Sequence, residues 1–137
     1  MKNCLFLLAS LYFAPLMGQK TSSSTPSKNS KAGILYGTAS YYADKFQGRP
    51  TASGEPYDKT KMTCACNKLP LGTWVKVTNL KNKKQVVVKI IDRLHYKNER
   101  LVDLSRAAAS KLGYIGSGLT KVEVEKVPPP AKKQQKK

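Results

Sequence analysis

The feature that most constrains this chain is an apolar run at residues 86–91, which ends at the acidic residue Asp92. The run lacks clean alternation, as is typical of a strand that is covered on both faces. Residues 74–79 alternate instead, and a polar turn joins the two segments, so together they predict a β-hairpin. The sequence therefore predicts a buried strand that carries a carboxylate to the point where the chain leaves the sheet.

Short strands dominate the rest of the apolar pattern. Further strands are expected at residues 37–42, 101–104 and 120–125, with turns at residues 54–58 and 70–73. One helix is expected at residues 106–112, because Ser105 can act as its N-cap and Gly113 can end it. Many short strands and one small helix favour a compact barrel, which buries its strand edges by closure.

Composition divides the chain into four parts. Residues 1–18 have a basic start, an apolar run and a small-residue exit, which indicate a secretory signal peptide too short to span a membrane. Residues 19–32 are rich in Ser, Thr and Lys and predict a flexible tether, while residues 128–137 form a basic tail rich in Pro and Lys. Residues 33–127 remain as one domain, long enough for a single small core.

The signal peptide predicts an exported protein of the periplasm or cell envelope, without a transmembrane span. Cys4 lies at the start of the apolar run, the wrong end for a lipid-acceptor cysteine, so no lipid anchor is expected. We expect a monomer.

Positive charge is the second strong signal. The formal net charge is +17, and residues 33–127 keep a net charge of +9 from 17 basic and 8 acidic residues. For an exported protein this excess indicates anionic groups of the cell wall or of lipids rather than nucleic acid, for which the sequence has no motif. A solvated basic surface without a dedicated partner is the alternative.

Export leaves Cys64 and Cys66 in an oxidising compartment. Two residues apart on a strand, their Cα atoms would lie about 6.6 Å from each other, so a disulfide between them would be strained. Two free, half-buried thiols are the alternative. A zinc site formed with His95 is disfavoured, because the spacing matches no standard motif, and neither a metal ion nor a cofactor is expected.

Asp92 is the first candidate for chemistry, because a carboxylate held at the end of a rigid strand can act as a general acid. The alternative is a structural acid that caps its loop or pairs with a nearby arginine. Asp103 lies beside Ser105 at the start of the expected helix, so we interpret it as a structural residue that caps the helix.

Six further segments follow one another at spacings that match a known family. They are Ala39-Ser40-Tyr41-Tyr42, Gly48-Arg49-Pro50-Thr51-Ala52-Ser53-Gly54-Glu55, Leu69-Pro70-Leu71-Gly72-Thr73, Val75-Lys76-Val77-Thr78-Asn79-Leu80, Ile91-Asp92-Arg93 and Val102-Asp103-Leu104-Ser105-Arg106-Ala107-Ala108. Together they resemble the rare lipoprotein A family. The resemblance implies a mainly β fold, a six-stranded double-psi β-barrel with one short α-helix, and lytic transglycosylase activity on peptidoglycan.

The resemblance also implies catalytic residues. Asp92 matches the acid of the family's Asp-Arg motif, and Glu55 matches the acid of its Thr-Ala-Ser/Asn-Gly-Glu motif. The family's third residue is a histidine, and Cys66 occupies its position here. The single histidine of this chain, His95, follows Asp92 by three residues instead. Our hypothesis is that His95 replaces the missing imidazole, and the alternative is a solvent-facing loop histidine.

The implied reaction cleaves the MurNAc–GlcNAc bonds of glycan strands that lack stem peptides, and it leaves 1,6-anhydro-MurNAc ends. One carboxylate, Asp92, can protonate the leaving oxygen and then accept the proton of the sugar's C6 hydroxyl. Glu55 would stabilise the positive charge that develops at the anomeric carbon. Arg93 and Arg106 are candidates to hold Asp92 or to bind the lactyl carboxylate of the substrate.

A competing prediction is a non-catalytic glycan-binding module, as in expansins, which share the barrel. Exposed aromatic side chains can stack on sugar faces. Together with Arg93, the candidates for substrate binding are Tyr41, Tyr42 and Tyr96. Trp74 could also stack on a sugar, but its alternating strand favours a place in the core.

Overall fold

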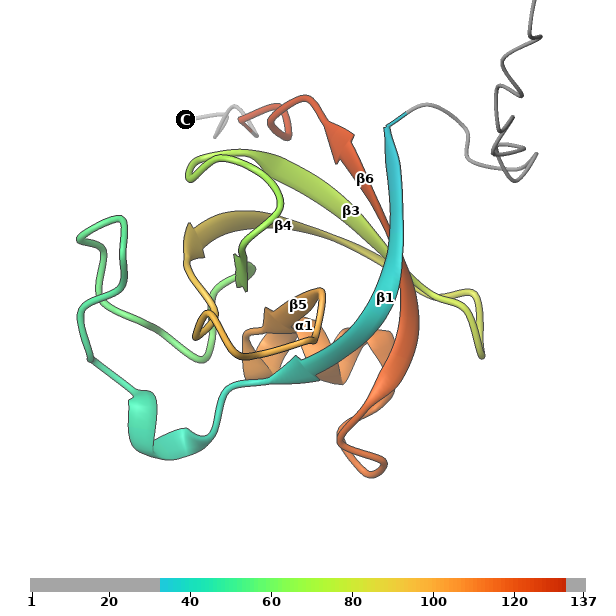
Figure 1. Ribbon diagram of the computed structural model, residues 1–137, viewed down its shortest axis with the longest axis horizontal. Coiled ribbons are helices and arrows are strands. Elements are labelled where there is room, and N and C mark those ends of the chain that lie inside the picture. The colour runs from blue at the N-terminus through green and yellow to red at the C-terminus, as the bar shows by residue number, and fades with distance from the viewer. Residues whose placement is uncertain (1–32, 133–137) are drawn as a thin grey trace, which may run out of the picture.

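The computed structural model describes residues 33–132 (Figure 1). The expected signal peptide, the tether and most of the basic tail lie outside these residues. Six strands, a 3₁₀ turn and an α-helix follow in chain order. They are β1 (Ile34–Tyr41), η1 (Asp44–Phe46), β2 (Thr63–Cys66), β3 (Trp74–Asn79), β4 (Gln85–Asp92), β5 (Val102–Leu104), α1 (Arg106–Leu112) and β6 (Thr120–Val127). Neither helix in this part of the chain is long and apolar enough to cross a membrane.

The strands close into a barrel in the order β1-β5-β2-β4-β3-β6, so that β6 pairs with both β3 and β1 (Figure 1). β1 pairs with β5 and β2 pairs with β4 in parallel, and the remaining pairs are antiparallel. The predicted hairpin is confirmed, with Val77 of β3 opposite Val86 of β4. The fold is therefore the mainly β, six-stranded double-psi barrel with one short helix that the resemblance implied.

β4 differs from its expected burial. Val86, Val88 and Ile90 are buried in the barrel core, whereas Val87 lies 37% exposed on the outer face. The strand thus alternates over most of its length, because a closed barrel has one inner and one outer face. The prediction of a strand covered on both faces holds only at Ile91, which is also buried.

A close approach between β1 and the segment before β5 explains one glycine. An ideal Cβ on Gly37 would lie 2.6 Å from Cβ of Leu101, a separation that real side chains do not tolerate. Gly37 therefore lets Leu101 pack directly over the β1 backbone, where it is buried among the core residues.

The helix begins and ends where the sequence predicts. The Ser105 hydroxyl accepts a hydrogen bond from the backbone N–H of Ala108, which satisfies a free donor in the first turn of α1. Gly113 adopts the left-handed conformation with φ of 78°, and its N–H bonds to the carbonyls of Ala109 and Ser110.

Both cysteines of β2 are free thiols buried in the barrel core. Of the two alternatives left open, the structure has free thiols, and they are fully rather than half buried. Burial raises the pKa of the Cys64 thiol well above its ordinary value, so the thiol stays protonated and unreactive. Among residues 33–132 no three His, Cys, Asp or Glu side chains lie close enough to hold a metal ion, so Cys64, Cys66 and His95 do not form a zinc site.

Candidate functional site: a groove around Asp92

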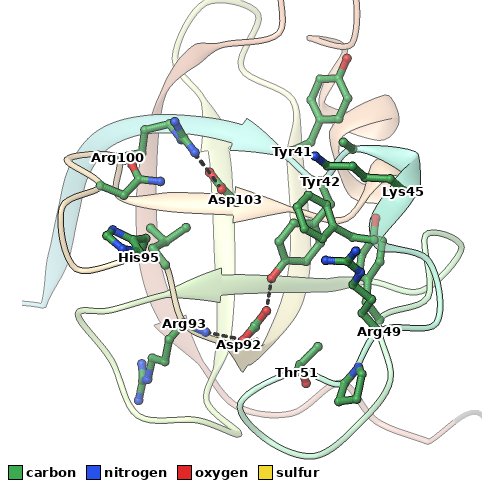
Figure 2. A pocket seen from close by; sticks show the side chains of 16 residues that line it. Tyr41, Tyr42, Lys45, Arg49, Thr51, Asp92, Arg93, His95, Arg100 and Asp103 are labelled. Carbon is green, nitrogen blue, oxygen red and sulfur yellow. Dashed lines mark hydrogen bonds and ion pairs between the residues drawn. The ribbon is translucent and has the colours of Figure 1, made fainter.

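A groove of about 680 Å³ opens where β1, η1, β4 and β5 meet (Figure 2). Aromatic side chains of the β1 end and the η1 segment line one part of it, and the loop after β4 lines another. The charged side chains that line it are Lys45, Arg49, Asp92, Arg93, Arg100 and Asp103. The groove therefore contains both carboxylates and cations, with Asp92 at the point where β4 ends.

The Asp92 carboxylate is held by three donors from three separate segments. Its Oδ1 accepts hydrogen bonds from the backbone N–H of Ala52 at 2.9 Å and of Arg93 at 2.8 Å. Its Oδ2 accepts a hydrogen bond from the hydroxyl of Tyr42 at 2.5 Å (Figure 2). Because both oxygens are bound, the carboxylate has one fixed orientation at the groove.

Tyr42 links Asp92 to an aromatic cluster. Its ring packs edge-on against Tyr57, with 4.4 Å between the ring centroids, and also lies beside Phe46 at 5.9 Å. Burial, followed by the hydrogen bond to Asp92, raises the pKa of Tyr42 far above its ordinary value. The Tyr42 hydroxyl therefore remains a proton-bearing donor to Asp92 at any pH at which the protein works.

A second carboxylate, Asp103 on β5, shares the groove and was expected to cap α1 instead. It is only 8% exposed, and it accepts two hydrogen bonds from the Arg100 guanidinium, at 2.8 and 3.0 Å. The interpretation of Asp103 as a helix cap is wrong, because the side-chain acceptors in the first turn of α1 are the hydroxyls of Ser105 and Tyr57. The signal that could have found this pair is the spacing of Arg100 and Asp103, three residues apart on either side of the start of β5.

Comparison with known proteins now identifies the family. The family model described as lytic transglycolase matches residues 35–124, which is most of the barrel. The chain belongs to the lytic transglycolase family. It is 47% identical over 104 residues to "Endolytic peptidoglycan transglycosylase RlpA" of Pseudomonas aeruginosa, a match that covers 76% of this chain and 30% of that protein. It is 43% identical over 93 residues to the protein of the same name from Neisseria meningitidis, covering 68% of this chain and 39% of that protein.

These matches confirm the resemblance to rare lipoprotein A proteins. The chain spans about a third of the length of these curated relatives. Among solved structures, an expansin of Clavibacter michiganensis superposes with a TM-score of 0.56 and 26% sequence identity, covering 72% of this chain and 52% of the expansin. The barrel of this lytic transglycolase domain is thus also the barrel of an expansin.

Two of the residues implied by the family resemblance do not line the groove. The Glu55 carboxylate forms an ion pair with Lys89 of β4 at 3.0 Å, and both side chains are partly exposed. The Cys66 side chain is 1% exposed and packs in the core. In this lytic transglycolase domain the carboxylate that shares the groove with Asp92 is therefore Asp103, and Glu55 would have to leave Lys89 to reach it.

Neither candidate arginine holds Asp92 through its guanidinium. Arg93 Nη1 donates hydrogen bonds to the backbone carbonyls of Cys66 and Leu69, so this side chain ties the loop after β4 to the end of β2. Only the backbone N–H of Arg93 reaches Asp92. Arg106 lies 3.7 Å from the carboxylate of Asp44 instead.

The remaining predicted site residues are divided between the groove and its surroundings. His95 lines the groove together with Tyr41, and its Nδ1 accepts a hydrogen bond from the backbone N–H of Lys97. Tyr96 stacks on His95 with 4.5 Å between the ring centroids and is 81% exposed. Trp74 is half-buried rather than part of the core, and it lines a separate shallow groove with Leu71 and Pro128.

Proposed function

We propose that this chain is an exported endolytic peptidoglycan transglycosylase that cleaves the MurNAc–GlcNAc bonds of glycan strands and leaves 1,6-anhydro-MurNAc ends. The observation that carries the proposal is the Asp92 carboxylate, fixed at a groove by donors from Tyr42, Ala52 and Arg93. Relatives named as endolytic peptidoglycan transglycosylases, at 43% and 47% identity, support the same reaction.

The reaction needs one group that gives a proton and then takes one back. Protonated Asp92 donates its proton to the glycosidic oxygen as the bond between that oxygen and the anomeric carbon breaks. The C6 hydroxyl of the same muramyl residue then attacks the anomeric carbon, and its proton passes to Asp92. The acid is thereby restored, and no second carboxylate and no water molecule are consumed.

The groove supplies a further carboxylate for the charge that develops during this reaction. Positive charge grows at the anomeric carbon in the transition state, and a nearby carboxylate stabilises it. Asp103 lines the groove but is paired with Arg100, whereas Glu55 is the residue that the family resemblance implies. The Glu55–Lys89 ion pair is partly exposed, so the side chain can be released at a cost of about 1 kcal/mol or less.

The proposed setting follows the sequence. A signal peptide at residues 1–18 would export the chain to the periplasm or cell envelope, without a lipid anchor. Residues 19–32 would tether a monomeric domain, residues 33–127, to which the basic tail at 128–137 is attached. Glycan strands of peptidoglycan are its partner in this proposal, and nucleic acid is not.

A non-catalytic glycan-binding module is the second candidate function. It is favoured by the likeness to the Clavibacter michiganensis expansin and by Cys66 at the position of the family histidine. Such a module would bind glycans in the same groove without breaking a bond, so its affinity would not depend on Asp92 as an acid.

Incubation of the purified chain with peptide-free glycan strands separates the two candidates. Mass spectrometry would detect 1,6-anhydro-muramyl ends, with Asp92→Asn as the test variant and Glu99→Gln, an exposed acid outside the groove, as the matched control. Anhydro ends that vanish only in Asp92→Asn support the enzyme. Glycan binding by both variants with no product from the wild-type chain supports the module instead.

The role proposed for His95 has its own test. His95 and Asp92 line the same groove, so the imidazole is in the part of the protein where the substrate would lie. We expect His95→Ala to lower the rate of anhydro-end formation, while Tyr96→Ala, which changes the neighbouring exposed ring, has a smaller effect. Unchanged activity of His95→Ala would show that the imidazole plays no part.

A further inference from the structure

The cations that line the groove fall into two classes. Arg100 is paired with Asp103, and Arg93 donates to backbone carbonyls, so both guanidinium groups already have partners. Lys45 and Arg49 line the same groove, and neither forms a salt bridge within the described residues 33–132. Two cations therefore face the groove without an anion.

These two cations sit together on one wall. The Lys45 ammonium and the Arg49 guanidinium each lie 5.3 Å from the centroid of the Phe46 ring. The ring attracts both charges, so both side chains are held beside Phe46. In Figure 2 they lie to one side of Asp92, while His95, Arg100 and Asp103 lie to the other.

The backbone that carries them is fixed. The N–H of Arg49 bonds to the Phe46 carbonyl at 3.1 Å, and the Arg49 carbonyl accepts from the N–H of Tyr57 at 2.8 Å. Gly48 turns the chain with φ of 78°, and its N–H bonds to the Tyr57 carbonyl. Because Tyr57 also packs against Tyr42, this wall keeps a constant position relative to Asp92.

We propose that Lys45 and Arg49 form a carboxylate-binding subsite that selects glycans bearing free lactyl carboxylates. A muramyl residue carries such a carboxylate on its C3 oxygen, and guanidinium and ammonium groups bind carboxylates through charge-assisted hydrogen bonds. This inference rests on the proposed function, because it names the substrate group that the groove around Asp92 recognises.

The subsite gives a chemical reason for a preference between glycan strands. Where a stem peptide is attached, the lactyl carboxylate has become an amide and carries no charge. Chitin-type oligomers of N-acetylglucosamine have no carboxylate at all. The Lys45–Arg49 wall therefore binds the muramyl residues of peptide-free strands better than either of these.

The test measures binding in the Asp92→Asn background, so that no ligand is consumed. Isothermal titration calorimetry of the full chain would compare a peptide-free glycan oligomer, the same oligomer with methyl-esterified carboxylates, and an N-acetylglucosamine oligomer of equal length. The test variant adds Lys45→Gln and Arg49→Gln. The matched control adds Lys81→Gln and Lys83→Gln, which remove two charges from the β3–β4 turn away from the groove.

We expect the Lys45→Gln and Arg49→Gln pair to weaken binding of the acidic oligomer about fivefold, with a flatter salt dependence, and to leave the two uncharged oligomers unaffected. The inference is overturned if the protein without these changes binds the charged and uncharged oligomers equally, or if it binds none of them. It is also overturned if the control pair loses as much affinity as the test pair. Thermal unfolding of each variant confirms that the loss is not due to misfolding. The outcome is independent of catalysis, because failure to form anhydro ends refutes the proposed function and leaves these affinities unchanged.

Discussion

Replacing Tyr42 by Phe tests whether the orientation of Asp92 governs the reaction. The change removes one hydroxyl, whose hydrogen bond to Asp92 Oδ2 is 2.5 Å long, and keeps the ring that packs on Tyr57. A hydrogen bond to a charged group contributes about 1.5–3 kcal/mol, but Tyr42 is only half-buried, so water can replace part of it. We therefore expect a loss of about 1–2 kcal/mol in transition-state stabilisation, which is roughly a 5- to 30-fold fall in kcat/KM.

The assay follows the release of 1,6-anhydro-muramyl ends from peptide-free glycan strands over a range of substrate concentrations. Tyr41→Phe is the matched control, because Tyr41 lines the same groove but donates its hydrogen bond to the carbonyl of Ile115. The Tyr42 ring is retained, but the folded protein loses the same hydrogen bond, so the free energy of unfolding of Tyr42→Phe should also fall by about 1–2 kcal/mol. Activity of Tyr42→Phe equal to that of Tyr41→Phe would refute the argument that the hydroxyl positions Asp92.

Three further predictions concern stability. Gly37→Ala places a Cβ 2.6 Å from Cβ of Leu101, so the free energy of unfolding in urea should fall by about 1–3 kcal/mol; an unchanged value would show that Leu101 moves aside freely. Burial raises the pKa of Tyr114, so its proton is retained in the folded protein while the unfolded chain ionises. The contribution of Tyr114 to stability should therefore be complete below about pH 10 and fall above it by about 1.4 kcal/mol per pH unit, in addition to the contributions of Tyr42 and Cys64, so Tyr114→Phe should make the slope shallower; an equal slope in the variant would contradict this. Cys66→His inserts a larger polar ring into the core and should cost about 2–4 kcal/mol, measured by thermal unfolding, whereas an equally stable and more active variant would show that the cysteine is a handicap.

Five of the six strands and the helix α1 could be predicted because their signals are local, whereas β2 was not among the strands that the pattern predicted. The alternation at β3 and the polar turn after it depend on a few neighbouring residues. The same is true of the two capping residues of α1, Ser105 at its start and Gly113 at its end. The burial of Cys66 was harder to predict, because all four residues of β2 are buried and the strand shows no alternation. Periodicity gives no information on a strand of this kind.

The site was predictable only in part, because its contacts join distant residues. Asp92 was found from its place at the end of an apolar run. Its bond to Tyr42 spans 50 positions and depends on one hydroxyl, which no sequence pattern reports. Glu55 was assigned from a motif alone, and its pairing with Lys89 depends on how the loop before β2 lies against β4.

The position of β6 has a consequence for how this protein comes into being. Of the strands in residues 33–132, β6 is the last to be synthesised, yet it lies between β1 and β3 and pairs with both. Until it is in place, the first strand lacks one of its two neighbours and the sheet has two open edges. A ribosome-bound chain that ends before residue 120 can therefore form at most the open sheet β1-β5-β2-β4-β3. The residues that line the groove have all been made by residue 103, but the barrel that carries them is closed only by the eight-residue strand β6.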